Sequence, residues 1–74
     1  MDDKFINYRV KVHTKDKAFV EGTLIRIDKY RNILLEDSEE FRKGYLKNPR
    51  EYLGLIIIPG ANIKYIEYLY KQKK

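Results

Sequence analysis

The chain has no cysteine and few residues that interrupt secondary structure, with two prolines and four glycines in 74 residues. Without cysteine it can form neither disulfides nor thiolate metal sites, and we expect a reducing compartment. It lacks an apolar run long enough to span a membrane, and its N-terminus lacks the apolar segment of a signal peptide. We therefore expect a cytoplasmic or a nuclear location.

Residues typical of catalytic and metal sites are also scarce. His13 is the only histidine, and it lies near Lys11 and Lys15 with no nucleophile in an obvious relation to it. The acidic run at residues 36–40 lies at the end of a predicted strand. Successive side chains along a strand point to alternating faces, so these carboxylates do not converge. We expect a solvated strand end there. The sequence predicts no enzyme activity, no metal and no cofactor.

The length and charge of the chain point to association with other molecules. Seventy-four residues make one domain with one core, which we place at 1–70, followed by a basic tail at 71–74. A domain of this size buries only about 60% of its unfolded surface, so association often adds to its stability. The formal net charge of +5 favours an acidic partner such as nucleic acid, although part of it lies in the tail.

Turn signals and alternating apolar residues predict five short strands. They span residues 9–13, 19–27, 32–37, 52–58 and 62–68, with solvated residues from 69 onward. Val10 and Val12 share one face, and Gly22 in a strand interior indicates a bend or a close backbone approach. The pattern predicts a small all-β fold, a bent antiparallel sheet or open barrel, preceded by one helical turn that Asp2 or Asp3 caps.

The most informative segment runs from Leu53 to Ile63. Four apolar residues, 55–58, precede Pro59 and Gly60, and apolar residues resume at once after them. A strand with one solvated face alternates apolar and polar residues. This one does not, so we expect both of its faces to be covered, in part by another subunit. The Pro-Gly pair predicts a type II turn over residues 58–61.

The order of these motifs resembles the Sm/LSm family. The first Sm motif would run from about Val10 to Asp37, with Gly22-Thr23-Leu24 followed by Asp28-Lys29-Tyr30-Arg31-Asn32, and the second from Leu53 to Ile66. The resemblance implies a strongly bent five-stranded antiparallel sheet, usually opened by a short helix. It also implies that the fourth and fifth strands pair with neighbouring subunits, often in rings.

Two subgroups of the family are similar in different segments. Residues 39–43, Glu-Glu-Phe-Arg-Lys, resemble the spliceosomal Sm B type. Residues 52–60 resemble the small Sm-fold auxiliary subunit of the NatC N-terminal acetyltransferase, which has a proline where RNA-binding Sm proteins carry arginine. The short connection between residues 43 and 50 also favours the second subgroup.

The family resemblance implies a candidate RNA site. In RNA-binding Sm rings an aromatic residue stacks on a base, an asparagine two positions later bonds the base edge, and an Arg-Gly pair closes the pocket. Tyr30 and Asn32 match the first two positions, and Asn62 is a further candidate contact. Pro59 replaces the arginine and has neither charge nor donor, so the resemblance implies a weakened uridine site. Roles in holding the turns together remain the alternative.

The resemblance thus implies two main functions for a non-catalytic subunit. The first is an auxiliary subunit of a NatC-type complex, with catalysis and acetyl-CoA binding on other chains that act on nascent N-termini at the ribosome. The second is an RNA-binding Sm B-like ring subunit for U-rich single strands in splicing, and a homomeric RNA-chaperone ring is a weaker third. Expected partner contacts are Leu53, Leu55, Ile56, Ile57, Ile58, Ile63, Tyr65, Ile66 and Tyr68, with Phe19 and Tyr45 as further contributors.

Overall fold

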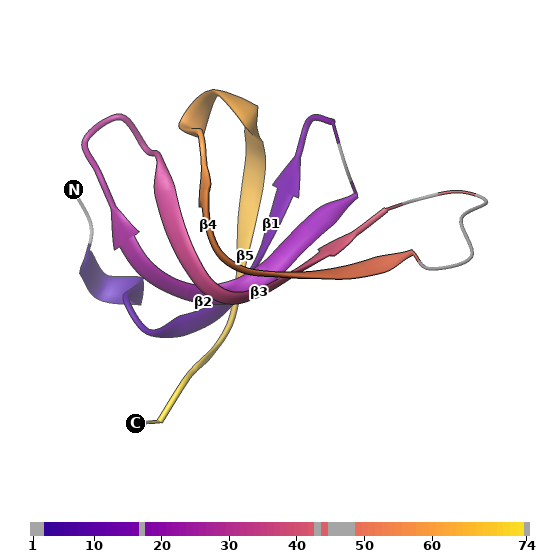
Figure 1. The fold of residues 1–74 in the computed structure, drawn as a ribbon. Coiled ribbons are helices and arrows are strands. Elements are labelled where there is room, and N and C mark those ends of the chain that lie inside the picture. The colour runs from indigo at the N-terminus through magenta and orange to yellow at the C-terminus, as the bar shows by residue number, and fades with distance from the viewer. Residues whose placement is uncertain (1–2, 17, 43, 45–48, 74) are drawn as a thin grey trace.

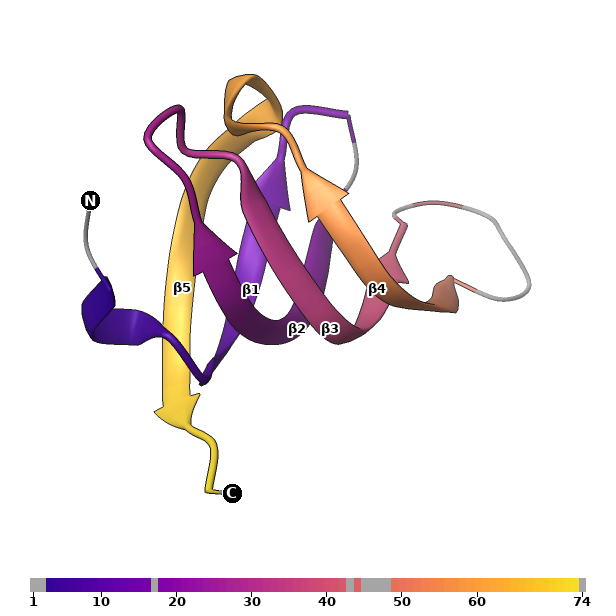
Figure 2. The same cartoon turned by 60° about the vertical axis from the view of Figure 1, so that its left-hand side comes forward.

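The computed structural model describes residues 3–16, 18–42, 44 and 49–73. These residues form one antiparallel sheet with the strand order β4-β3-β2-β1-β5. The strands are β1 (Tyr8–Thr14), β2 (Phe19–Ile27), β3 (Ile33–Phe41), β4 (Arg50–Ile58) and β5 (Ile63–Lys71), with the 3-10 turns η1 (Asp3–Phe5) and η2 (Gly60–Asn62). Figure 1 and Figure 2 show the long strands curving so that the sheet folds over on itself.

The expected fold is confirmed as a strongly bent five-stranded antiparallel sheet with a short N-terminal 3-10 turn. Asp3 opens this turn, and its carbonyl oxygen accepts a hydrogen bond from the Ile6 N–H (3.2 Å). Asp2, the other expected cap, lies outside the described residues. In the described part of the chain, no helix has the length and apolar character needed to cross a membrane.

Four strands extend beyond their predicted ranges, β1 and β4 by one or two residues at an end and β3 and β5 by three or more at their C-terminal ends. β3 continues to Phe41, so the solvated strand end expected at 36–40 is wrong. Glu40 is only 3% exposed, and its buried carboxylate accepts a hydrogen bond from Arg42 (3.0 Å). β5 continues to Lys71, which pairs with Tyr8 of β1. Residues 69–71 therefore belong to the sheet and are not a solvated tail.

The core is small and lies on one face of the bent sheet. Val10 and Val12 are fully buried on the same face of β1, as their spacing predicts. Burying such a side chain contributes about 1.5–3 kcal/mol. Among the residues that the structure describes, the buried apolar ones are Val10, Val12, Val20, Leu24, Ile33, Leu35 and Ile58. A core of this size matches a chain that gains stability from association.

Gly22 marks the bend in β2, where the sequence predicts a close backbone approach. A Cβ at this position would lie 3.0 Å from the Cβ of Ser38 and 3.1 Å from the Cβ of Leu35. The pairing of β2 with β3 shifts register between Glu21 and Thr23. Such irregularities increase the local twist of a strand. The missing side chain therefore lets β3 cross β2 closely where the sheet folds over.

The sheet has two open edges, because β4 pairs only with β3 and β5 pairs only with β1. The outer side of each edge strand presents backbone N–H and C=O groups that a further strand can bond. The β2–β3 loop, η2 and the β1–β2 connection lie together at one end of the sheet in Figure 1. The fold therefore places the edges and a cluster of loops where other molecules can reach them.

Candidate subunit-interface and nucleic-acid sites

The β2–β3 loop is organised around the side chain of Asp28. Its Oδ1 accepts hydrogen bonds from the backbone N–H groups of Tyr30 (2.8 Å) and Asn32 (3.0 Å), and its Oδ2 accepts one from Asn32 Nδ2 (3.0 Å). Arg31 has a φ of 70°, in the left-handed region. A carboxylate that accepts hydrogen bonds from backbone N–H groups two and four positions later stabilises such a tight loop. The family spacing of Asp28 and Asn32 is thus explained by the structure of the loop itself.

These contacts determine the direction in which the pKa of Asp28 moves. Partial burial raises the pKa, but the hydrogen bonds from the side chain and backbone of Asn32, the Tyr30 N–H and the charge of Arg26 outweigh it. The pKa of Asp28 therefore lies below its ordinary value of 3.8. At neutral pH the carboxylate is ionised, which is the form that accepts all three hydrogen bonds.

Tyr30 and Asn32 lie in the same loop but differ in their freedom to contact a ligand. The Tyr30 side chain is 69% exposed, and Lys29 Nζ lies 5.2 Å from its ring centroid. The Asn32 amide is already engaged, because its Oδ1 accepts a hydrogen bond from the Gly60 N–H (2.9 Å) and its Nδ2 donates to Asp28. One N–H and one lone pair of the amide remain for a base. The Tyr30 ring is therefore free to stack on a base, whereas the Asn32 amide already forms hydrogen bonds that hold two loops together.

The loop between β4 and β5 differs from the predicted type II turn. Gly60 lacks the positive φ that this turn requires at its third position. Instead η2 is a single 3-10 turn in which the Asn62 N–H donates to the Pro59 carbonyl (3.0 Å). A Cβ on Gly60 would lie only 2.5 Å from the Tyr30 carbonyl oxygen. Glycine is needed here because the β2–β3 loop packs directly against η2.

Asn62 is not part of the Tyr30 and Asn32 cluster. Its Nδ2 donates a hydrogen bond to Asp16 Oδ1 (3.0 Å), and its carbonyl accepts one from the Lys15 N–H (2.9 Å). Asn62 therefore joins η2 to the β1–β2 connection. Pro59, at the position of the family arginine, is exposed and brings no cation to the loop. The structure thus brings Tyr30, Asn32 and Gly60 together and places Asn62 in a separate contact.

The β4 edge has one covered face and one exposed face. Ile58 belongs to the core and Ile56 packs against it. Leu55 and Ile57 are 67% and 69% exposed. The sequence predicts that both faces of this strand are covered. The core covers one face of β4, and the other face is exposed and available to a partner. Leu53 is half-buried on the same strand.

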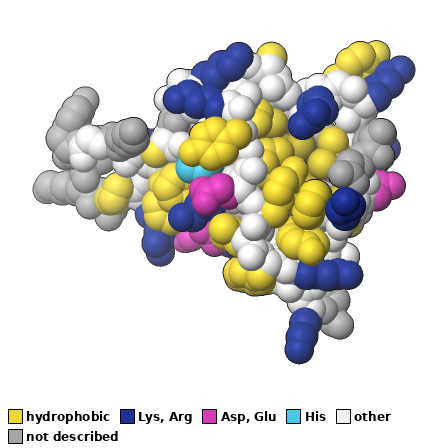
Figure 3. All heavy atoms as spheres, turned by 180° about the vertical axis from the view of Figure 1, so that it is seen from behind, with side chains coloured by type: hydrophobic (Ala, Val, Ile, Leu, Met, Phe, Trp, Pro, Cys, Tyr) yellow, Lys and Arg dark blue, Asp and Glu magenta, His cyan; other side chains and the backbone are white. Residues whose placement is uncertain are grey.

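The β5 edge likewise has some side chains packed against the core and others exposed. Ile63 and Ile66 pack against the core. Tyr65 and Tyr68 are exposed, although Tyr68 stacks on Phe5 of η1 with ring centroids 3.9 Å apart. Phe19, a weaker candidate, is half-buried on β2, and Tyr45 lies outside the described residues. Figure 3 shows hydrophobic side chains over the middle of one face, with basic side chains mostly around its rim.

Several contacts could not be assigned from the sequence. Arg9 is buried within β1, and its guanidinium contacts Glu21 (3.3 Å) and Asp37 (3.4 Å) and donates to Thr23 (3.2 Å). His13 contacts Glu67 on β5 (2.7 Å). No local pattern in the sequence indicates the first network, because Arg9 joins residues of three different strands. No group of three or more histidine or acidic side chains suited to a metal ion occurs in the described ranges.

The sharply bent sheet, its two open edges and the Asp-Asn loop packed against a Pro-Gly turn define an Sm-like subunit. The chain belongs to the LSM domain family, whose model matches residues 2–68. It is 32% identical over 65 residues to small nuclear ribonucleoprotein-associated protein B of Dictyostelium discoideum. That match covers 81% of this chain but only 24% of the relative, so the chain spans about a quarter of the relative's length.

Solved structures with the same fold come from two kinds of assembly. A heptameric archaeal Sm protein has a TM-score of 0.76 and 28% identity, over 90% of this chain and 93% of that one. The Pyrococcus abyssi Sm protein, solved with a uridine heptamer, has a TM-score of 0.76 and 27% identity, covering 89% of each chain. A chain of the NatC complex bound to CoA has a TM-score of 0.74 and 25% identity, covering 99% of this chain and 91% of that one.

Proposed function

We propose that this protein is a non-catalytic Sm-fold subunit that completes its sheet with strands of partner chains. The observation that carries the proposal is the pair of open edges with exposed apolar side chains, Leu55 and Ile57 on β4 and Tyr65 on β5. Backbone pairing along an edge supplies affinity, and side chains on the faces supply specificity. Exposed apolar residues on an unpaired edge otherwise favour aggregation, so a covering partner accounts for them.

The partner assembly we favour is a cytoplasmic NatC-type N-terminal acetyltransferase, in which this chain supports the large auxiliary subunit and catalysis lies on other chains. Three observations support this choice. Pro59 supplies no cation at the position where RNA-binding Sm proteins have arginine, and the short β4–β5 turn packs on the β2–β3 loop as a structural contact. A chain of the NatC complex also shares the fold over 99% of this protein.

A pull-down with mass spectrometry tests this assignment. We expect the tagged chain to recover an acetyltransferase and its large auxiliary subunit, and we expect Ile57→Lys to lose both. Arg26→Gln, on an exposed side chain of β2 away from both edges, is the matched control and should recover them. Recovery of other Sm proteins without an acetyltransferase would contradict the NatC assignment while leaving edge pairing intact.

A second function has its own support. The exposed ring of Tyr30, the two remaining bonding positions of Asn32 and the Sm B relative favour binding of U-rich single-stranded RNA in a nuclear splicing particle. Stacking of a base on an aromatic ring contributes about 1–3 kcal/mol. Asn62 contributes little to such a site, since its amide is bonded to Asp16. A homomeric ring of RNA-chaperone type would use the same loop.

Labelled oligouridine separates the two functions. The NatC assignment predicts weak binding with no dependence on Tyr30. The RNA-binding assignment predicts micromolar or tighter binding that falls with Tyr30→Ala and rises with Pro59→Arg. The titration should be repeated at several salt concentrations, because the basic C-terminal residues bind any polyanion in a salt-dependent way.

A further inference from the structure

A hollow of about 430 Å³ is formed by β5 together with the β2–β3 loop and the strand ends that flank this loop. We call it the β5 hollow. Isoleucines from three strands supply most of its apolar lining: Ile27, Ile33, Ile63 and Ile66. The other described residues that line it are Arg31, Gly60, Lys64, Tyr65 and Tyr68.

The β5 hollow lies beside an open edge of the sheet. β5 pairs only with β1, so its other side is unpaired. Ile63 and Ile66 pack against the core, and therefore lie on the core side of β5. A strand that pairs with β5 directs alternate side chains to this same side. Those side chains meet the isoleucines, so the hollow continues the proposed partner contact at β5.

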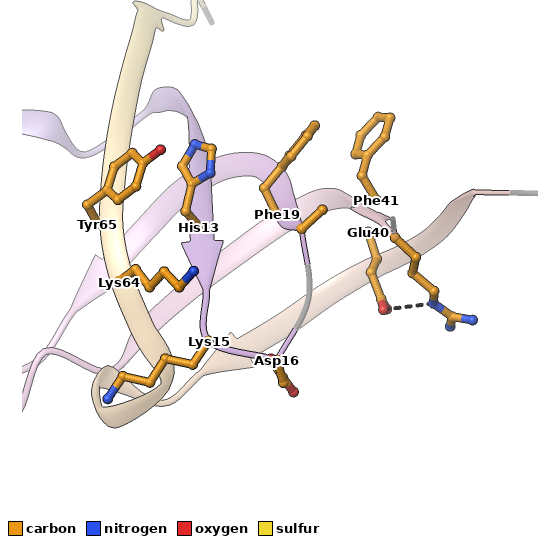
Figure 4. Close-up of a pocket in the computed structure, with 10 residues that line it drawn as sticks. His13, Lys15, Asp16, Phe19, Glu40, Phe41, Lys64 and Tyr65 are labelled. Atoms are coloured by element: carbon orange, nitrogen blue, oxygen red, sulfur yellow. Dashed lines mark hydrogen bonds and ion pairs between the residues drawn. The ribbon is translucent and has the colours of Figure 1, made fainter. Parts of the chain in front are cut away.

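Two of the described residues that line the β5 hollow carry positive charge. Arg31 and Lys64 are exposed, and neither forms an ion pair within the described part of the chain. None of the described lining residues is acidic. In Figure 4 the amino group of Lys64 lies apart from the carboxylates of Asp16 and Glu40. The hollow thus combines an apolar lining with cations that can pair with an added acid.

The carboxylates carried by the same segments are engaged elsewhere. Asp28 accepts three hydrogen bonds within the β2–β3 loop. Glu67 follows Ile66 on β5, so its side chain points to the opposite side of the strand, where it contacts His13 (2.7 Å). An acid that pairs with the cations of the β5 hollow must therefore come from another molecule.

A second hollow, beside β4, has the opposite character. It measures about 250 Å³, and its apolar lining comes mostly from β4. Asp16 and Glu40 line it, whereas the described lining residues include no lysine or arginine. Arg42 donates to Glu40 from outside this lining. The two open edges of the sheet therefore differ in the sign of the charge beside them.

We propose that the β5 hollow receives an acidic side chain from a partner protein strand that pairs with β5. The inference rests on the edge pairing of the proposed function and adds the chemistry of the partner at this edge. The strand carries apolar side chains against the isoleucines, with an aspartate or glutamate among them that faces Arg31 and Lys64. At β4 the same carboxylate would meet Asp16 and Glu40, so charge selects the edge that the strand joins. An acidic polymer without apolar groups would leave the isoleucines exposed.

The test measures binding of labelled, capped strand peptides to the full chain. The peptides are as long as β5 and alternate valine with threonine, and only their central valine is replaced. We expect a central aspartate to bind about fivefold more tightly than asparagine, which has the same shape without the charge. A central lysine should bind more weakly than either. High salt should remove the difference between aspartate and asparagine, because screening acts on the charge.

Variants of the chain locate the effect. Arg31→Gln together with Lys64→Gln should bring the affinities for the aspartate and asparagine peptides to within about twofold of each other. Lys71→Gln is the matched control, because Lys71 is exposed on the same strand but does not line the hollow, and it should keep the preference. His13 is the only histidine and stacks on Tyr65 of β5. We therefore expect its ring proton signals to shift when a peptide pairs with β5.

The outcomes separate this inference from the edge pairing on which it rests. Equal binding of the aspartate and asparagine peptides, with shifted His13 signals, would overturn the inference and leave edge pairing intact. Absence of peptide binding, or unmoved His13 signals at saturation, would overturn pairing at β5 and the inference with it. Self-association of the chain that the double glutamine variant abolishes would make a second copy the occupant. Tighter binding of labelled oligouridine, lost in the same variant, would make nucleic acid the occupant. Either result would overturn the proposal.

Discussion

Among single residues, Gly60 decides how closely two loops approach. A Cβ there would lie 2.5 Å from the Tyr30 carbonyl oxygen and 2.9 Å from that of Arg31. Backbone atoms cannot give way as a flexible side chain can, so one loop must move. We expect Gly60→Ala to lower the free energy of unfolding by about 1–3 kcal/mol, measured by urea unfolding.

Ala61→Ser is the control for this change, because Ala61 lies in the same turn and is exposed. It should unfold within about 0.5 kcal/mol of the unmodified chain. If Gly60→Ala matched that control, the two loops would separate without cost. The proposed structural role of the η2 contact would then be wrong.

The ionisation of Asp28 links the same loop to pH. Because the folded pKa lies below the unfolded value of 3.8, the carboxylate adds stability above that value and loses it as the pH falls through the folded pKa. We expect Asp28→Asn to reduce stability at pH 7, since its Nδ2 cannot accept the bond from Asn32. The difference from the unmodified chain should shrink in strong acid. Urea midpoints measured from pH 7 downward test this, and a constant difference would contradict it.

The parts of the site that lie close in sequence could be predicted, and the parts that join distant segments could not. The spacing of Asp28, Tyr30 and Asn32 identifies the loop, because a turn is held by residues two to four positions apart. The contact of Asn32 with Gly60 spans 28 positions and that of Asn62 with Asp16 spans 46. Such contacts depend on how the whole sheet bends, which no local pattern contains.

For single elements, the alternation along β4 separates partner contacts from core contacts. Ile57 is 69% exposed and Ile58 is 5% exposed. We expect Ile57→Lys to keep the circular dichroism spectrum and to change stability by no more than about 0.5 kcal/mol. Ile58→Lys buries a charge and should cost about 4 kcal/mol or more, enough to unfold a small domain.

The same pair of variants also tests edge pairing. Ile57→Lys should lose partner chains in a pull-down although it remains folded. If the isolated Ile57→Lys chain unfolded, Ile57 would be a core residue and the assignment of faces on β4 would be wrong. If it stayed folded and kept its partners, this face would not be the contact surface.

The end of β5 gives a second test at this scale. Lys71 pairs with Tyr8, the Gln72 N–H donates to the Asn7 carbonyl (2.8 Å), and the Thr23 hydroxyl bonds the Gln72 side chain. Removing residues 69–74 should therefore cost about 1–3 kcal/mol. Removing only residues 73 and 74 should cost almost nothing. Equal melting temperatures for the two truncations would restore the view that residues 69–74 form a tail.

The strands were predictable where apolar residues alternate and less so where polar groups are buried. β2 runs from Phe19 to Ile27, as its pattern predicts. β3 extends four residues beyond its predicted end because Ser38 and Glu40 are buried with partners, Ser38 donating to the Gly54 carbonyl (2.6 Å). Where buried side chains are polar and hydrogen-bonded, a strand lacks the alternating apolar pattern from which it could be predicted.

The whole molecule is an open sheet whose core buries only part of its apolar side chains. Seven buried apolar residues in the described ranges stabilise it, while Leu55, Ile57 and Tyr65 remain exposed near the two edges. A partner that binds only the folded chain stabilises it by mass action. Partner binding should therefore matter more to this chain than to a larger domain with a complete core.

This reasoning predicts how the melting temperature responds to the partner. We expect the chain purified with its recovered partners to unfold at a higher temperature than the chain alone, and the difference to grow with partner concentration, as mass action requires. Scanning fluorimetry over a range of partner concentrations measures it. Ile57→Lys should melt like the unmodified chain when alone but gain nothing from the partner, because its edge cannot be covered. If the melting temperature did not change with partner concentration, partner chains would not stabilise the edge strands, and the proposed edge pairing would be wrong.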